Sequence, residues 1–136
     1  MTEEKIDKNT KLSLAVYKHP TFTSLMLTVL RSKSRDDKNP KEIGKASVQI
    51  EQKSADWCEI IIKNPRNRNK GIGSKVVKLM IDYMTDWGVK EVNGTITLVD
   101  DLEKAANFWE KNGFSVDKET LAQGKATKIR LLINKN

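Results

Sequence analysis

The spacing of hydrophobic residues changes between the two halves of this 136-residue chain, and that change constrains the fold more than any other feature of the sequence. In the first half, apolar residues alternate with polar ones, which is the pattern of strands with one buried face. In the second half, apolar residues recur every three or four positions from Ile72 to Trp87, which predicts an amphipathic helix over about 70–87. A chain that passes from strands to helices in this order forms an α/β domain with a mixed sheet.

The first half predicts an antiparallel meander of four strands with short connections. The four segments are residues 12–16, 22–29, 43–50 and 57–63. The last one contains the run Ile60-Ile61-Ile62, which is apolar on both faces as in a central strand. The polar stretch from Arg31 to Lys41 is expected to form a long exposed hairpin loop. Residues 1–10 are expected to be a flexible N-terminal segment.

The second half predicts two helices separated by a strand, followed by two more strands. Gly88 lies where a helix C-terminus commonly takes a left-handed residue. Val92 to Val99 predicts a strand, with a hairpin turn at Asn93-Gly94 as the less favoured alternative. A second helix is expected from about Asp100 to Gly113. The last two strands, joined by a polar loop, are expected at Phe114 to Val116 and at Lys128 to Ile133.

Composition excludes several classes of protein. Hydrophobic residues make up 38% and charged residues 32%, which is the balance of a soluble globular domain. The charge-free segment Thr21 to Leu30 is half the length of about 20 residues that a membrane span needs, and the N-terminus lacks an apolar signal region. The single cysteine and single histidine, Cys58 and His19, cannot form an internal disulfide or a zinc site by themselves. We therefore expect one cytoplasmic domain over residues 1–136 without a structural metal.

The positive charge is concentrated in one part of the chain. The net charge is +7, and six basic residues without any acidic one fall between Ile60 and Ile81. Such a window indicates either a solvated basic face or a site for an anionic partner. The basic residues are Lys63, Arg68, Lys70, Lys75, Lys78 and Arg66.

The junction between the fourth strand and the long helix falls inside this window and contains two glycines. Gly71 and Gly73 allow the backbone to approach a ligand without interference from a Cβ atom. The first turn of a helix offers unpaired N–H groups and the positive end of the helix dipole, which together bind anions. With the side chains of Arg68 and Lys70 added, the segment predicts a pyrophosphate site.

Two common glycine motifs do not fit this segment, whereas a third does. A dinucleotide fingerprint requires Gly or Ala where Val76 stands, and a P-loop requires a Gly-Lys-Ser/Thr sequence that is absent. Arg68 to Gly73 instead resembles the Arg/Gln-x-x-Gly-x-Gly/Ala acyl-CoA loop of the GNAT-superfamily N-acetyltransferases. Ala105 to Phe114 is similar to that family's second signature, Asn-x-x-Ala-x-x-Phe-Tyr-x-x-x-Gly-Phe, and it follows after one predicted strand, as the family requires.

The resemblance implies a GNAT-like mixed central sheet with acetyl-CoA as co-substrate. It implies that the loop binds the CoA pyrophosphate and that the preceding strand end pairs its backbone with the pantetheine arm. One backbone N–H of that strand end would polarise the thioester carbonyl. The implied binding residues are Ile62, Lys63, Arg68, Asn69, Lys70, Gly71, Ile72, Gly73 and Ser74.

Two departures from the family pattern affect what the resemblance implies. Leu102 and Trp109 occupy the family Asn and Tyr positions, and an indole N–H cannot replace the tyrosine that commonly protonates the leaving thiolate. Trp109 is therefore expected to be a core or cofactor-contacting aromatic residue. The family usually has one or two helices between its first two strands, but Lys18 to Thr21 is too short for a helix. Loops, the Arg31–Lys41 hairpin or the second subunit of a homodimer would then complete the acceptor site.

Glu59 is the candidate general base, because it is the only carboxylate in the strand that leads to the loop. The attacking amine must be neutral, and a positioned base contributes about 10²–10⁴-fold to such a reaction. The alternative is that Glu59 is a solvent-facing charge. Cys58 is not expected to be a nucleophile, and His19 is expected to be a surface residue in a turn.

Three functions remain open at this point. The favoured one is an N-acetyltransferase that transfers an acetyl group from acetyl-CoA to a primary amine of a small molecule or a protein. The second is an acyl-CoA-binding protein of the same fold without catalysis, motivated by Leu102 and Trp109. The third is a nucleic-acid-associated module, or a transferase that acts on an RNA-linked amine, and the window of basic residues motivates it. A pure nucleic-acid binder is less favoured, because the basic residues alternate with a glycine turn rather than with exposed aromatic residues.

Overall fold

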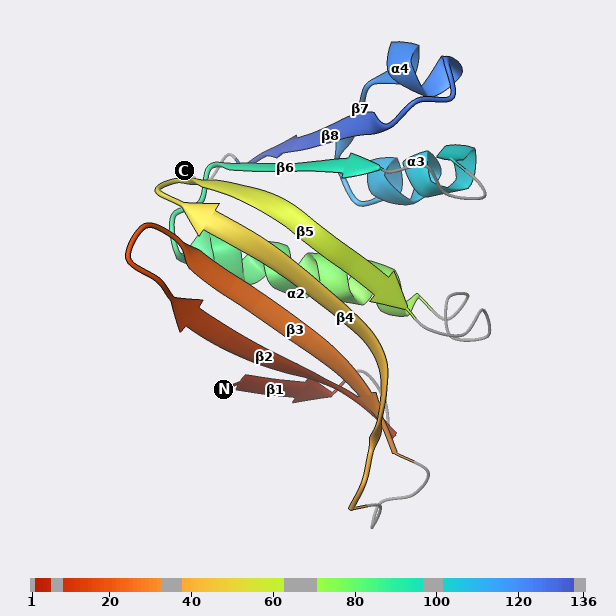
Figure 1. Cartoon of the computed structure of the whole chain (residues 1–136). Coiled ribbons are helices and arrows are strands. Elements are labelled where there is room, and N and C mark those ends of the chain that lie inside the picture. Colours follow the sequence, from red (N-terminus) through yellow and green to blue (C-terminus); the bar gives the residue numbers. More distant parts are fainter. Residues whose placement is uncertain (1, 6–8, 33–37, 63–70, 97–101, 134–136) are drawn as a thin grey trace.

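The first half of the chain folds into five antiparallel strands. A computed structural model describes residues 2–5, 9–32, 38–62, 71–96 and 102–133 (Figure 1). Each of the five strands pairs with the next one along the chain, which confirms the predicted meander. These strands are β1 (Thr2–Lys5), β2 (Thr10–Lys18), β3 (Thr23–Arg31), β4 (Lys41–Glu51) and β5 (Ser54–Ile62).

The second half completes a mixed sheet. The eight strands follow the order β1-β2-β3-β4-β5-β6-β8-β7, and β5 and β6 form a parallel pair. The predicted α/β class with a mixed central sheet is thereby confirmed. The remaining elements are α2 (Ile72–Asp86), β6 (Glu91–Ile96), α3 (Leu102–Lys111), β7 (Ser115–Val116), α4 (Lys118–Ala122) and β8 (Thr127–Leu132).

Helix α2 covers one face of the meander and builds the main core with it (Figure 1). The helical stripe predicted from the sequence is the buried face of α2 from Ile72 to Met84, and the alternating residues of β2 to β4 face it. Trp87, the last residue of the predicted stripe, lies after the helix and is 44% exposed. The central residues of this core include Leu25, Leu27, Val48, Val76, Met80 and Met84, all at most 1% exposed. Gly88 adopts φ = 82°, so the left-handed residue predicted after the helix is present.

The other face of the meander carries no helix within the described part of the chain (Figure 1). The connection between β2 and β3 is a four-residue turn in which the His19 N–H donates to the Phe22 carbonyl over 2.8 Å. Both residues belong to the turn, and their rings stack at 4.4 Å. The expectation that no helix separates these two strands is therefore confirmed, and the sheet face on this side is accessible.

The N-terminal segment differs from the sequence expectation. Thr2–Lys5, for which no strand was predicted, forms strand β1, with Glu4 opposite Leu12 of β2. The sequence Thr-Glu-Glu-Lys contains no apolar residue, so no alternating pattern could predict this strand. Backbone hydrogen bonds pair it with β2.

The expected polar loop between the last two strands contains a short helix. Helix α4 has no buried residue, and this explains why no hydrophobic period predicted it. Asp117 caps α4 by accepting from the Thr120 N–H at 3.3 Å and from the Thr120 hydroxyl at 2.7 Å. The hydrogen bond from the Thr120 hydroxyl is the largest cause that lowers the pKa of the Asp117 carboxyl below its usual value, and the one from the Thr120 N–H adds to it.

The alternative hairpin turn at Asn93-Gly94 is wrong, because both residues lie within β6.

Two methionines test whether α2 and the meander form the core that stabilises the fold. Met80 is 0% exposed on α2, whereas Met26 is 44% exposed on the uncovered face of β3. We expect Met80→Ala to lower the free energy of unfolding by about 2–5 kcal/mol, since it leaves a cavity. The matched variant Met26→Ala should change it by less than about 0.5 kcal/mol. Urea denaturation followed by circular dichroism measures both, and equal effects would contradict the assignment of the core.

Candidate functional site

Strands β5 and β6 separate after a short contact, and this separation creates the main opening in the sheet. They pair only at Ser54↔Glu91, Ala55↔Val92 and Asp56↔Asn93, after which β5 continues to Ile62 and β6 to Ile96 without a shared ladder. Figure 1 shows the two strands diverging toward their C-terminal ends. Beyond Asp56, β6 therefore provides no partner for the backbone groups along that edge of β5.

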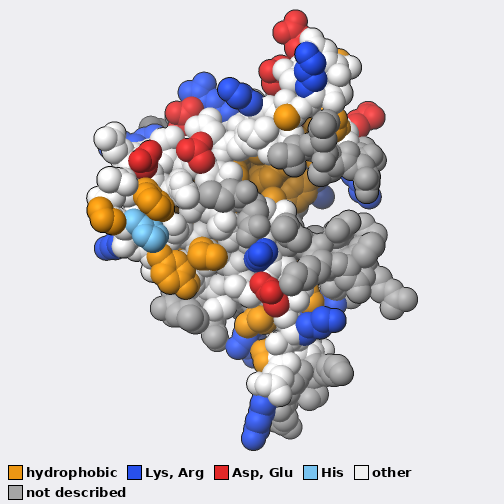
Figure 2. Space-filling model, in the orientation of Figure 1, with side chains coloured by type: hydrophobic (Ala, Val, Ile, Leu, Met, Phe, Trp, Pro, Cys, Tyr) orange, Lys and Arg blue, Asp and Glu red, His pale blue; other side chains and the backbone are white. Residues whose placement is uncertain are grey.

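A β-bulge lies at the point where the strands begin to diverge. Trp57 is opposite Val48 and Glu59 is opposite Ser47, so Cys58 is the extra residue of the bulge. A bulge bends its strand and increases the local twist, which turns β5 away from β6. Figure 2 shows a hollow with hydrophobic side chains at its floor, between the part of the molecule that contains β6 and the meander.

Aromatic rings pack together at the closed end of this divergence. The Trp57 and Trp109 rings lie 5.5 Å apart, and Trp109 also contacts Phe108 at 5.1 Å and Phe114 at 4.9 Å. Trp109 is 7% exposed and belongs to the hydrophobic core, in agreement with its expected role as a packing residue. The indole nitrogen of Trp57 is buried and has no hydrogen-bond partner in the described structure.

The start of α2 has the backbone that the glycine motif predicts. Gly71 precedes the helix in the left-handed conformation, with φ = 73° and ψ = 11°, and no side chain caps the helix. The first turn contains no acidic residue, so its N–H groups and the positive end of the dipole meet no competing carboxylate there. The Ile72 side chain is 1% exposed and packs in the core, so only its backbone could contact a ligand.

The first turn of α2 is held by α3. A Cβ atom on Gly73 would lie 3.0 Å from the Phe108 ring, so a larger residue there would force the ring to shift by a few tenths of an ångström. The Asn112 side-chain amide donates to the Ser74 hydroxyl at 3.2 Å and to the Phe108 carbonyl at 2.8 Å. The two sequence signatures are therefore in direct contact in the structure.

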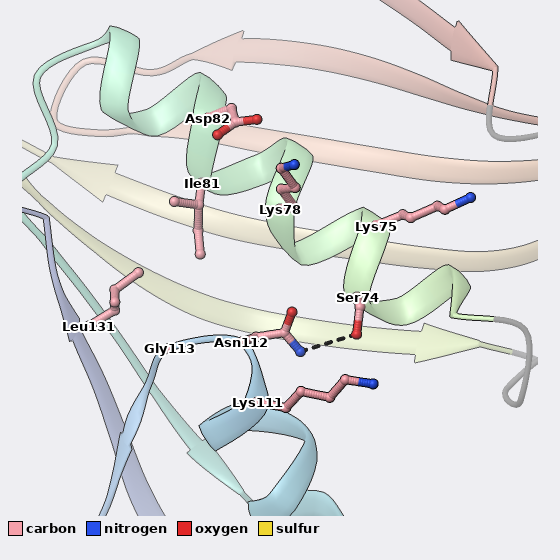
Figure 3. A pocket seen from close by; sticks show the side chains of 9 residues that line it. All are labelled: Ser74, Lys75, Lys78, Ile81, Asp82, Lys111, Asn112, Gly113 and Leu131. Carbon is pink, nitrogen blue, oxygen red and sulfur yellow. Dashed lines mark hydrogen bonds between the residues drawn. The ribbon is translucent and has the colours of Figure 1, made fainter.

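An open pocket of about 520 Å³ lies between α2, the end of α3 and β8 (Figure 3). In Figure 3, Ile81 and Leu131 point toward one another at one end, Lys111 extends from α3 below Ser74, and Lys75 points outward from the first part of α2. Three lysines and one aspartate give the lining an excess of positive charge. The lining residues are Ser74, Lys75, Lys78, Ile81, Asp82, Lys111, Asn112, Gly113 and Leu131.

Several of the predicted site residues can be placed and others cannot. The backbone of Glu59 and Ile62 lies in β5, and Gly71, Ile72, Gly73 and Ser74 gather at the start of α2. The side chains of Glu59 and Ile62 lie outside the described part of the structure, as do Lys63, Arg68, Asn69 and Lys70. Lys111, Asn112 and Leu131 line the pocket, although the sequence pattern predicted no site role for them and the second signature contains the first two.

Within residues 2–5, 9–32, 38–62, 71–96 and 102–133, no group of three or more His, Cys, Asp or Glu side chains could hold a metal ion. Among the helices of those segments, none has the length and apolar character needed to cross a membrane.

Comparisons with known proteins agree with this geometry. The sequence model of the acetyltransferase (GNAT) family matches residues 29–114. No curated protein matches the chain by sequence.

Solved structures share the fold at low sequence identity. PaiA N-acetyltransferase from Thermoplasma acidophilum, in complex with coenzyme A, is 19% identical with a TM-score of 0.63, over 81% of this chain and 61% of that one. The NatC complex bound to Gag peptide and CoA is 20% identical with a TM-score of 0.62, over 80% and 71%. The ribosomal-protein-S18-alanine N-acetyltransferase from Escherichia coli is 15% identical with a TM-score of 0.59, over 88% and 74%. The chain thus spans about three fifths of the length of PaiA.

Proposed function

This chain belongs to the acetyltransferase (GNAT) family, and from that premise we propose that it transfers an acetyl group from acetyl-CoA to a primary amine. The observation that carries the proposal is the divergence of β5 and β6 beside an uncapped helix N-terminus. An extended arm with amide groups can bind along an unpaired strand edge, and a diphosphate can bind at the start of a helix. Acetyl-CoA contains both groups in one molecule.

The pantetheine arm would run along the edge of β5 that β6 leaves free. From Trp57 to Ile62 this edge is roughly 17 Å long at about 3.3–3.4 Å per residue. Its backbone N–H and C=O groups can pair with the two amides of the arm, as an added strand would. The diphosphate would then lie at Gly71 to Ser74, because α2 starts near the end of β5 (Figure 1).

The pocket beside α2 would hold the adenosine end of the molecule. Ile81 and Leu131 are half-buried apolar residues that can contact a base, while Lys75 and Lys111 can reach a phosphate (Figure 3). Ser74 lines both this pocket and the first turn of α2, which makes the two binding regions continuous. An ammonium group is a compact point charge that suits a phosphate monoester.

The chemical step would be a direct attack of a neutral amine on the thioester carbonyl. The N–C bond forms, the C–S bond breaks, and the amine loses a proton to a base or to water. Glu59 remains the proposed base, because its backbone places it in β5 directly after the bulge at Cys58. A buried Trp109 provides no acid, so the CoA thiolate would leave without protonation from that position, which a thiol pKa of about 8.5 permits.

The acceptor would approach over the accessible face of the meander. The four-residue turn between β2 and β3 leaves this side without the helices that the family usually places there. One structural neighbour was solved with a Gag peptide, and another is named for an alanine of a ribosomal protein. We propose that the acceptor is a primary amine of a small molecule or a protein, and that the reaction takes place in the cytoplasm.

A second candidate is an acyl-CoA-binding protein of the same fold without rapid turnover. The burial of Trp109 at the position of the family tyrosine favours it. The two candidates bind the same ligand at the same place and differ only in whether an amine is acetylated.

Release of free thiol from acetyl-CoA distinguishes the two candidates. We expect release that depends on an added amine from a panel of polyamines, amino acids and peptide N-termini. Glu59→Gln should lower kcat by about 10²-fold or more and remove the acidic limb of the pH profile, with little change in the Kd for acetyl-CoA. Tight binding of acetyl-CoA without amine-dependent release would support the binding protein, and an unchanged pH profile in the variant would exclude Glu59 as the base.

Gly71→Val tests the anion site at the start of α2. A β-branched residue is strained at φ = 73°, and its side chain would occupy the space through which a diphosphate approaches. We expect the Kd for acetyl-CoA to rise at least tenfold, as measured by calorimetry. Gly124→Val is the matched control, because Gly124 also has a positive φ of 69° and open space around it but lies far along the chain after α4. Equal effects of both variants on Kd would contradict the assignment.

Lys75→Ala combined with Lys111→Ala tests the adenosine pocket. We expect the KM for acetyl-CoA to rise about tenfold with kcat unchanged, because charged hydrogen bonds to phosphate contribute to binding and not to the reaction. Acetyl-dephospho-CoA, which lacks the 3′-phosphate, should bind the variant and the unaltered protein equally well. Lys18→Ala, an exposed lysine at the end of β2, is the control. If the double variant lost affinity for acetyl-CoA and for acetyl-dephospho-CoA equally, the two lysines would not contact the 3′-phosphate.

A further inference from the structure

The uncovered face of the meander carries an apolar patch that the mechanism described so far does not use. Tyr17 of β2 is 51% exposed and Met26 of β3 is 44% exposed. Met26 is directly opposite Ala15, so Tyr17 and Met26 are diagonal neighbours on one face of the sheet, within reach of each other. In the orientation of Figures 1 and 2, α2 lies behind the meander, and Figure 2 shows hydrophobic side chains gathered beside His19 on the near side.

The register of the sheet connects this patch to the position of the proposed base. Met26 is opposite Ser47 of β4, and Ser47 is opposite Glu59 of β5. Residues directly opposite one another in antiparallel strands form one row on the same face. Two strand spacings of about 4.7–4.9 Å separate the backbones of Met26 and Glu59 along this row, which gives roughly 9.5 Å. An acceptor of moderate length whose amine lies at Glu59 therefore reaches the patch with its other end.

The surface between the patch and β5 is small and uncharged. Ser47 is the central residue of the row, and its short side chain leaves space above the sheet. In the next row, Tyr17 is opposite Ser24, and Ser24 is opposite Gln49. The described residues of that row include a carboxylate only at Asp56, which is opposite Gln49 and three strands away from Tyr17.

The charge of the chain disfavours an acceptor with several amino groups. The net charge of +7 repels a polycation as it approaches. A second ammonium group at the patch would lose contact with water without gaining a carboxylate beside it. A methyl or aromatic group there gains apolar contact with Tyr17 and Met26, and the flexible thioether of methionine adapts to different shapes.

Resting on the proposed function, we propose that Tyr17 and Met26 determine the acceptor specificity, and that the acceptor is a primary amine with a single positive charge and an apolar far end. The amine lies at Glu59, the acceptor chain crosses above Ser47, and the apolar end packs on Tyr17 and Met26. A free alkylamine or arylalkylamine has this chemistry, as does a peptide with an apolar side chain close to its N-terminal amine.

Heptylamine and 1,6-diaminohexane test the proposal, because they have the same length and differ in one end group, a methyl in the first and an ammonium in the second. We expect kcat/KM per amino group to be at least tenfold higher for heptylamine. Met26→Ala should raise the KM for heptylamine about fivefold, and it should leave kcat/KM unchanged for ethylamine, which is too short to reach the patch. Met26→Glu should reverse the preference between the two long amines.

Two tripeptides distinguish the sources of the apolar group. Ala-Leu-Ala and Ala-Lys-Ala share an N-terminal amine and differ in the neighbouring side chain. If the acceptor is a peptide, the leucine peptide is acetylated at least tenfold faster than the lysine peptide and faster than heptylamine. If the acceptor is a free amine, heptylamine is the better substrate. Faster acetylation of the lysine peptide would contradict the proposal.

Controls separate the failure of this proposal from the failure of the proposed function. Leu132→Ala is the matched variant, because Leu132 is 56% exposed on β8, on the other side of β6 from the meander, and it should leave the KM for heptylamine unchanged. If no amine is acetylated, the proposed function fails. If amines are acetylated, but 1,6-diaminohexane is used as well as heptylamine or Met26→Ala affects ethylamine equally, the function stands and the patch does not select the acceptor.

Nuclear magnetic resonance of the methionine methyl groups gives a readout without turnover. The chain has four methionines, and Met80 and Met84 are 0% exposed in the core. With CoA present, heptylamine should shift the methyl signal that is absent from Met26→Ala and leave those of Met80 and Met84 unchanged. A saturating heptylamine concentration that leaves the Met26 signal in place would overturn the proposal.

Discussion

The early end of the β5–β6 ladder is the constraint on which the proposed site depends. Three residue pairs hold the two strands together, and the bulge at Cys58 then turns β5 away. Beyond these pairs, the described strand β6 leaves backbone groups of β5 without a ladder partner in the middle of an eight-stranded sheet, where they would ordinarily be paired. An unpaired central edge of this kind is stable only if a ligand, water or covering side chains satisfy it, and an extended arm with amides does so directly.

Contacts between helices α2 and α3 hold the start of α2 beside this opening. The contact of Gly73 with Phe108 and the hydrogen bond between Asn112 and Ser74 fix the first turn of α2 against α3. The helix N-terminus is therefore presented beside the open end of the divergence, and the pocket with Lys75 and Lys111 adjoins it. In the proposed function, the start of α2, the edge of β5 and the basic pocket together bind one acetyl-CoA molecule, and their residues lie far apart in the sequence.

Much of the fold could be predicted because the spacing of hydrophobic residues indicates which face of a helix or strand is buried. The meander, the stripe of α2 from Ile72 to Met84 and the left-handed Gly88 follow from that pattern and are present. β1 and α4 could not be predicted, because one is held by backbone pairing and the other buries no side chain. The family assignment rested on two short signatures, and the family match over residues 29–114 confirms it.

The candidate site could be predicted only where a local motif encodes it. The turn and helix start at Gly71 to Ser74 depend on neighbouring residues, so the sequence could indicate them, and their binding role stays a prediction. The divergence after Asp56, the bulge and the contact of Trp57 with β6 depend on how distant strands pair, which no local pattern reveals. Lys111 was missed because a lysine at the end of a helix has the same sequence appearance whether or not it lines a pocket.

Hydrogen–deuterium exchange with and without acetyl-CoA tests the central claim most directly. The account predicts slower exchange for the backbone amides of residues 57–62 and of the first turn of α2, with the amides of β2 and β3 unchanged. Binding of acetyl-CoA that protects other segments, and leaves β5 and the start of α2 as they were, would contradict it.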